Sequence, residues 1–108
     1  MRFMQFDIRT ASDIGVALRA ARKAQNLRQD DAAGSIGVSE SFLGKVENGA
    51  ESVHWGKLFQ VLEGLGVHLA ADIPDDAGQL FAREQTGQHA RAARSERRRR
   101  LKEQADVS

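Results

Sequence analysis

The sequence predicts a mainly α-helical fold, in which a bundle of four core helices is flanked by two short strands. Apolar residues recur at helical spacing in four segments between residues 11 and 65, and they alternate at strand spacing before and after these segments. Glycine or asparagine follows each helical segment, as is common at helix ends. The 108 residues are enough for one domain with a modest core.

The amino-terminal part predicts a strand and then a helix. Apolar and polar residues alternate over residues 2–9, which is the period of a strand. Thr10 and Asp13 then match a capping box, so we expect a helix over residues 11–25. Asn26 tolerates a left-handed conformation and is expected to end it.

Two short helices joined by a glycine turn are predicted next. The first spans residues 29–36 and is closed by Gly37 in a positive-φ conformation. Ser39 caps the second helix through its hydroxyl, and Asn48-Gly49 ends it. Its inward side chains are expected to be Phe42, Leu43 and Val46. A short helix, a tight turn and a second short helix can present one polar face to the major groove of DNA.

The fourth helix and the second strand complete the predicted domain. We expect the helix to begin after Ser52, a capping residue, and to end at Gly66. Its core stripe consists of Leu58, Val61, Leu62 and Leu65. The strand and predicted dimerisation residues are Val67, Leu69, Ala71 and Ile73. Because two strands are only marginally stable, they must pair with each other, with a second subunit, or both.

The carboxyl-terminal part concentrates positive charge. The chain has a net charge of +1, but residues 91–102 hold seven basic side chains and one acid. This part favours helix locally and has almost nothing to bury, so we expect residues 77–108 to form a mobile or transiently helical tail beside a domain over residues 1–76. Three roles stay open: a solvated segment, an arm on DNA phosphates, or a docking peptide for an acidic partner such as a toxin. The basic residues are Arg91, Arg94, Arg97, Arg98, Arg99, Arg100 and Lys102.

The sequence contains no residue pattern typical of a catalytic site or a metal site. The chain has no cysteine, and its three histidines lack a second ligand at metal spacing. Ser39 and Ser41 have no recognisable base, and no glycine-rich phosphate loop follows a strand. We therefore expect no enzyme, metal or cofactor. No apolar run suits a membrane span or a signal region, so we expect a cytoplasmic, nucleoid-associated protein without a membrane partner.

A short polar set remains exposed on the predicted helix pair. We assign base-edge contacts to Glu40, Ser41 and Lys45, because base edges are read by side chains that reach into the groove. The other polar members are assigned to phosphate oxygens. The whole predicted DNA-binding set is Arg28, Gln29, Ser39, Glu40, Ser41, Gly44, Lys45 and Asn48. The alternative is that these are ordinary solvated residues.

One group of residues between Thr10 and Ile73 carries a resemblance to a known family. It comprises Leu18, Arg19, Arg22, Leu27, Gln29, Ala33, Ile36-Gly37-Val38-Ser39, Phe42, Lys45 and Glu47-Asn48-Gly49. These residues resemble the lambda-repressor-like, or XRE, helix-turn-helix family. Residues 62–69 look like the end of a HipB-type antitoxin, a type in which a strand after the last helix pairs across the dimer. The resemblance implies a homodimer on double-stranded operator DNA, with a HipA-type kinase toxin as partner.

Three positions depart from the family pattern. Arg28 stands where the family usually has Thr or Ser, which removes a helix cap and adds a cation. Glu40 replaces a common Gln, and a carboxylate accepts from cytosine N4 instead of binding adenine. Gly44 replaces a residue that is commonly polar. We therefore expect an autoregulating repressor and antitoxin with its own operator. The alternatives are a free-standing regulator without a toxin and a protein-interaction module that uses the fold as a scaffold.

Overall fold

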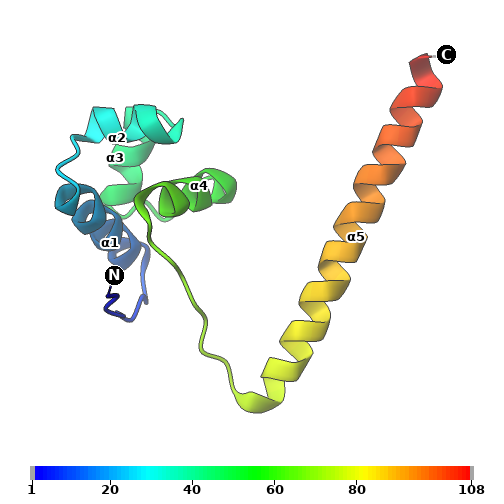
Figure 1. Cartoon of the computed structure of the whole chain (residues 1–108), viewed down its shortest axis with the longest axis horizontal. Helices are drawn as coiled ribbons and strands as arrows, with labels where there is room; N and C mark the ends of the chain where they lie inside the picture. The colour runs from blue at the N-terminus through cyan, green and yellow to red at the C-terminus, as the bar shows by residue number, and fades with distance from the viewer. Residues whose placement is uncertain (1, 108) are drawn as a thin grey trace. The chain divides into compact units, whose positions relative to one another are not determined.

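The computed structural model describes residues 2–107 and is helical, with no strand among these residues (Figure 1). The helices are α1 (Ala11–Ala24), α2 (Gln29–Ile36), α3 (Glu40–Glu47), α4 (Trp55–Leu65) and α5 (Asp75–Val107). The chain divides into two compact units, and the boundary between them in the sequence falls between Leu69 and Ala70. Helices α1 to α4 make up the first unit, and α5 belongs to the second. The predicted mainly α fold with four core helices is confirmed.

The ends of α1 form as the local sequence predicts. The Thr10 hydroxyl accepts a hydrogen bond from the Asp13 amide at 3.1 Å, and the Asp13 carboxylate accepts one from the Thr10 amide at 3.1 Å. This reciprocal capping box fixes the start of the helix. Asn26 has a φ of 56°, in the left-handed region, so the chain turns sharply after the last helical residue.

The core lies between the four short helices. Each of α1 and α2 contacts both α3 and α4. The buried apolar residues are Leu18, Ala32, Ala33, Leu43, Val46, Leu58, Val61, Leu62 and Leu65. Those of α3 and α4 were expected to face inward from helical spacing, which confirms the predicted apolar faces of these two helices. The small side chains of Ala32 and Ala33 let α2 approach its neighbours closely.

A glycine sets the distance between α1 and the end of α3. Gly15 is buried, and a methyl group at this position would lie 2.5 Å from the Glu47 carbonyl oxygen and 2.6 Å from that of Val46. Real side chains do not make such contacts with backbone atoms, so only glycine fits without moving the helices apart. No local sequence pattern indicates this close approach, because it joins residues about 30 positions apart.

The two flanking strands do not form in the single chain. Residues 2–9 and 67–74 are irregular, although the Phe3 ring stacks on His68 with 5.8 Å between ring centroids. A strand needs a hydrogen-bonded neighbour, and these two segments share a ring contact without building a ladder. Val67 packs against the core and its amide donates to the Leu62 carbonyl at 2.9 Å, so it completes the end of α4 and is not a free strand residue.

Two further expectations need correction. Ser52 does not cap α4, because the chain stays non-helical through His54, whose Nδ1 accepts from the Lys57 amide at 3.1 Å. The tail predicted to be mobile or transiently helical is instead one continuous helix, α5. Its alanine, arginine, glutamine and glutamate residues have high helix propensity, which gives a local reason for the helix without a buried face.

Candidate nucleic-acid interface

The turn between α2 and α3 fixes the orientation of the second helix. Gly37 adopts a φ of 94°, which is favourable for glycine, and ends α2. Two residues later the Ser39 hydroxyl accepts a hydrogen bond from the Phe42 amide at 3.0 Å and starts α3. Leu43 and Val46 are buried on the inner side of α3. The turn and the buried side chains together leave one side of α3 facing outward.

The outward side of α3 is polar and accessible. Ser39, Glu40, Ser41, Lys45 and Asn48 are all exposed. Ser39, Glu40 and Ser41 lie at the start of α3, where base-reading residues of such helices lie. The face offers a carboxylate, two hydroxyls, an ammonium and an amide, which are groups able to hydrogen-bond base edges or phosphate oxygens.

Gly44 lies beneath the side chain of Gln29, and both are half-buried. A methyl group at Gly44 would lie 3.5 Å from the Gln29 amide oxygen, an ordinary contact distance. The Gln29 side chain also hydrogen-bonds Glu47 and thereby helps to lower its pKa. Gln29 is therefore held between α2 and α3, at the first helical residue of α2.

Arg28 lies at the start of α2 without capping it. Its side chain makes no cap hydrogen bond and is exposed, with the guanidinium 3.3 Å from the Asp30 carboxylate. The missing cap agrees with the absence of Thr or Ser at this position. Because an exposed pair of this kind contributes little, Arg28 can exchange Asp30 for another anion.

A buried ion network anchors α3 to α1. The Glu47 carboxylate accepts from Arg22 Nε at 2.7 Å and from Arg22 Nη2 at 2.8 Å. Arg19 Nε approaches the same carboxylate at 3.4 Å, and Arg19 Nη2 donates to the Asn48 side chain at 3.1 Å. Arg22 Nη1 donates in addition to the Leu27 carbonyl at 2.9 Å. The network therefore joins α1, the α1–α2 loop and the end of α3.

The charges in this network stabilise each other. Burial raises the pKa of Glu47, but the hydrogen bond and charge of Arg22, with hydrogen bonds from Arg19 and Gln29, outweigh burial and hold that pKa below its usual range. The hydrogen bond to Glu47 raises the pKa of Arg22. Both residues therefore stay charged near neutral pH, and Arg22 is not a free cation for a ligand.

Sequence reasoning missed the role of this network. It placed Arg19 and Arg22 on the polar side of the first helix, away from its apolar stripe, whereas Arg22 is buried. The spacing of Arg22 four residues after the buried Leu18 was a usable signal, because it places a cation on the inner face of α1. A charge on an inner face needs a buried partner, and Glu47 was a candidate.

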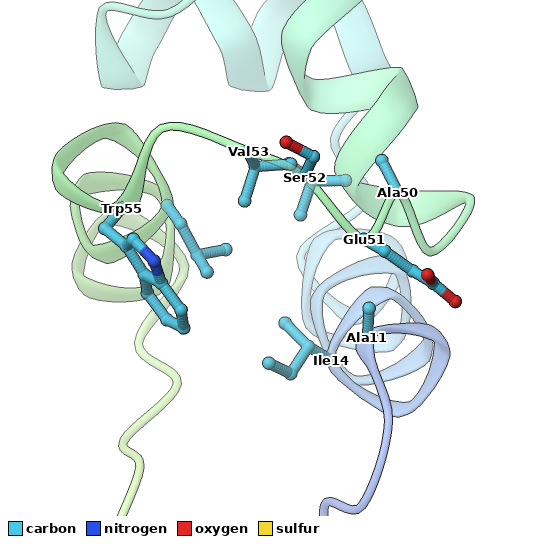
Figure 2. Close-up of a pocket in the computed structure, with 9 residues that line it drawn as sticks. Ala11, Ile14, Ala50, Glu51, Ser52, Val53 and Trp55 are labelled. Carbon is cyan, nitrogen blue, oxygen red and sulfur yellow. The ribbon is translucent and has the colours of Figure 1, made fainter.

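A hollow of about 200 Å³ lies between the start of α1, the loop from α3 to α4, and the start of α4. Figure 2 shows Ile14 of α1 and Trp55 of α4 bordering the same space, with the Glu51 carboxylate pointing away from it. Trp55 is 67% exposed and stacks on Phe59 at 6.1 Å between ring centroids. Trp55 is the first helical residue of α4, and most of its surface is open.

The remaining predicted residues belong to other parts of the chain. Of the predicted dimerisation residues after Val67, Leu69, Ala71 and Ile73 are exposed. All seven predicted basic tail residues lie exposed along α5. Within residues 2–107, no group of three or more His, Asp or Glu side chains is arranged to hold a metal ion. No helix in that range combines the length and apolar character needed to cross a membrane.

Comparison with known proteins agrees with this geometry. A family model described as a helix-turn-helix domain matches residues 13–73. An uncharacterised HTH-type transcriptional regulator of Sinorhizobium fredii, y4mF, is 48% identical over 59 residues, which cover 55% of this chain and 78% of the relative.

Solved structures with a similar fold include a HipB-O4 20mer complex and a HipA-HipB-O2-O3 complex. Each alignment spans 66% of this chain and the whole of the chain in the solved structure, with a TM-score of 0.59 and 17% sequence identity. At that identity the likeness concerns the fold. The family model, the curated relative and the four-helix arrangement together show that this chain belongs to the helix-turn-helix family, of the lambda-repressor-like or XRE type.

Proposed function

We propose that the chain is a sequence-specific DNA-binding transcriptional repressor. The observation that carries this proposal is the accessible polar face of α3, whose buried opposite side is fixed to α1 and α2. A rigid helix with short polar side chains on its outer face suits insertion into a major groove. The description of the S. fredii relative as a transcriptional regulator supports the same function.

The proposed contacts divide into two groups. Glu40, Ser41 and Lys45 contact base edges, and the Glu40 carboxylate favours cytosine because it accepts from the N4 amino group. Gln29 contacts a phosphate, since its position between α2 and α3 gives it a fixed direction. Arg28, Ser39 and Asn48 are assigned to neighbouring phosphates, and Gly44 lies beside the Gln29 side chain.

We propose that the protein binds as a homodimer. The exposed apolar side chains of Leu69 and Ile73, and the apolar residues of segment 2–9, supply an unpaired surface for a second copy. Two recognition helices would then reach successive major-groove faces about 34 Å apart on a palindromic site. Dimerisation also doubles the phosphate contacts, which matters because residues 1–72 carry no excess of positive charge.

Selection from a pool of random duplexes tests this function. We expect the full chain to enrich a palindrome whose half-sites have centres about 10 base pairs apart. A pool that shows no enrichment after repeated selection, with folded protein, would contradict the proposal. Sedimentation of the chain with and without the selected duplex measures the stoichiometry, and one chain per duplex would contradict the dimer.

The finer proposal is an antitoxin that represses its own operon with a HipA-type kinase toxin. Its support is the fold likeness to HipB, which has been solved in a complex with HipA. A kinase-like reading frame beside this gene, whose product co-purifies with the chain and is growth-inhibitory alone, is the expected result. A gene with no such neighbour would favour the free-standing regulator.

A protein-interaction module is the second candidate function. The stacked and largely exposed pair of Trp55 and Phe59 favours it, because exposed aromatic residues often anchor a protein partner. Enrichment of no duplex, together with binding of a partner protein that Trp55→Ala abolishes, would select this function.

A further inference from the structure

The basic residues of α5 are not spread evenly around the helix. Arg91, Arg94, Arg98 and Lys102 follow one another at intervals of three, four and four residues. With 3.6 residues per turn, these positions fall within about 80° of the helix circumference. We call these four residues the basic stripe. Three of them, with Ser95, border one shallow surface hollow, so their side chains share a face.

The acidic residue within the span of the basic stripe lies on the other side of the helix, whereas Glu84 and Asp106 lie near the stripe's side but beyond its two ends. Glu96 and Glu103 fall on the opposite side of α5 by helical position, and Glu96 pairs with Arg100 at 2.8 Å. Within the described chain, Arg94, Arg98 and Lys102 have no carboxylate within ion-pair distance. Arg91 donates only to the neutral Gln88 amide, at 3.0 Å. One face of α5 therefore presents four cations with no intervening acid.

The stripe matches a run of phosphates better than other anionic surfaces. Its ends are about 16 Å apart along the helix, a span over which duplex DNA presents about ten phosphate charges. A membrane surface would call for an apolar face beside the charge, and α5 has none. A protein partner would call for a packed apolar or aromatic anchor, and the stripe consists of three arginines and one lysine.

We propose that the basic stripe of α5 binds the phosphate backbone of DNA flanking the operator. This inference rests on the proposed DNA-binding function and adds a second contact surface to it. The first unit needs such an addition, because Arg22 is buried in an ion pair and Arg19 is held by Glu47 and Asn48. Continuous basic helices that extend from a dimer also bind DNA in other proteins, where they lie in the major groove.

Two triple variants of the full chain test the proposal. The first replaces Arg91, Arg94 and Arg98 with Gln and removes three charges from the basic stripe. The matched control replaces Arg97, Arg99 and Arg100 with Gln, and removes three charges from the same helix at other positions around it. Glutamine and arginine have similar helix propensity, so both triples should retain α5, which circular dichroism checks.

The measurement is the salt dependence of binding to a selected duplex with long flanks. The stripe triple should make the slope of log K against log salt shallower by about 2.7 per bound chain. This corresponds to roughly 40-fold less change in affinity per chain between about 50 and 200 mM salt. The control triple should leave the slope nearly unchanged, and trimming the flanks should remove the difference between the two triples.

The other outcomes overturn the proposal. Equal slopes for both triple variants and the parent chain mean that α5 does not touch DNA. If both triple variants reduce the slope by the same amount, α5 acts only as diffuse charge. Loss of binding to an acidic protein, with an unchanged DNA slope, assigns the stripe to a protein partner. If the stripe fails but the duplex is still preferred over scrambled sequence, the proposed DNA-binding function stands. If the parent chain prefers no duplex, that function fails too.

Discussion

Replacing Glu47 with Gln removes the charge at the centre of the buried network and keeps the shape of the side chain. The Glu47 side chain has 0% exposure, and two bonds of 2.7 and 2.8 Å join it to Arg22. The variant leaves the Arg22 guanidinium buried without an opposite charge. Breaking a buried pair in this way lowers the free energy of unfolding by about 3–5 kcal/mol.

The expected loss is large for a domain of this size. Globular proteins have stabilities of roughly 0.05–0.15 kcal/mol per residue, so the four-helix unit has only a few kcal/mol to lose. A loss of about 3 kcal/mol lowers the melting temperature of such a domain by roughly 12 °C or more. Arg19 is the matched control, because its side chain is 44% exposed and lies 3.4 Å from the same carboxylate. Arg19→Ala should lower stability by about 1 kcal/mol or less.

Urea and thermal unfolding followed by circular dichroism measure both variants at neutral pH. Because α5 lies outside the core, it adds a circular dichroism signal that does not report on the four-helix unit. Comparison with a chain that ends before Asp75 gives the size of this signal, which is then removed. The contrary result is a Glu47→Gln variant that loses no more stability than Arg19→Ala. That result would mean that water or a neighbouring group replaces the carboxylate, and that the network does not anchor α3.

Three other predictions concern stability. Folding lowers the pKa of Glu47, so its contribution to the free energy of unfolding is complete above the unfolded glutamate pKa of about 4.3 and is lost as pH falls through the lower folded value. Unfolding of the parent chain at a series of acidic pH values should show this loss of stability. An equal loss in Glu47→Gln would contradict the prediction. Gly15→Ala should lower the free energy of unfolding by roughly 1–3 kcal/mol, because the added methyl group forces α1 away from α3. Gly34→Ala, whose methyl group would meet no atom within 4 Å, should instead stabilise α2 by about 0.5–1 kcal/mol. Stability changes of the same sign in both variants would contradict the close approach at Gly15. Ser39→Ala should lower stability by about 1 kcal/mol through loss of the cap on α3, and an unchanged unfolding midpoint would contradict that role.

The helices were predictable because their signals are local. The capping box at Thr10, the positive φ at Gly37 and the cap at Ser39 each depend on residues within a few positions of one another. The apolar stripe of α4 likewise needs only helical spacing to identify its core residues. The exposed face of α3 followed from the same spacing, once the inward side chains had been assigned.

Long-range features were not predictable in the same way. The Arg22–Glu47 pair joins residues 25 positions apart, and the close approach at Gly15 depends on how α1 crosses the end of α3. The start of α4 was placed too early, since Ser52 has cap chemistry but the chain becomes helical only after His54. Apolar and polar side chains alternate over residues 2–9 and 67–73, as they do in strands. A strand also requires hydrogen bonds to a neighbouring backbone, and the side-chain pattern does not supply them.

A substitution at Glu40 shows whether the outer face of α3 reads DNA sequence. Glu40→Ala should relax the choice of one base pair in each selected half-site by about 1–3 kcal/mol, roughly 5- to 150-fold, while the rest of the site is unchanged. Glu63→Ala is the control, because it removes an exposed carboxylate from α4, outside the proposed interface. If Glu40→Ala selects the same bases as the parent chain with the same stringency, α3 does not read the groove through this residue and the account is contradicted.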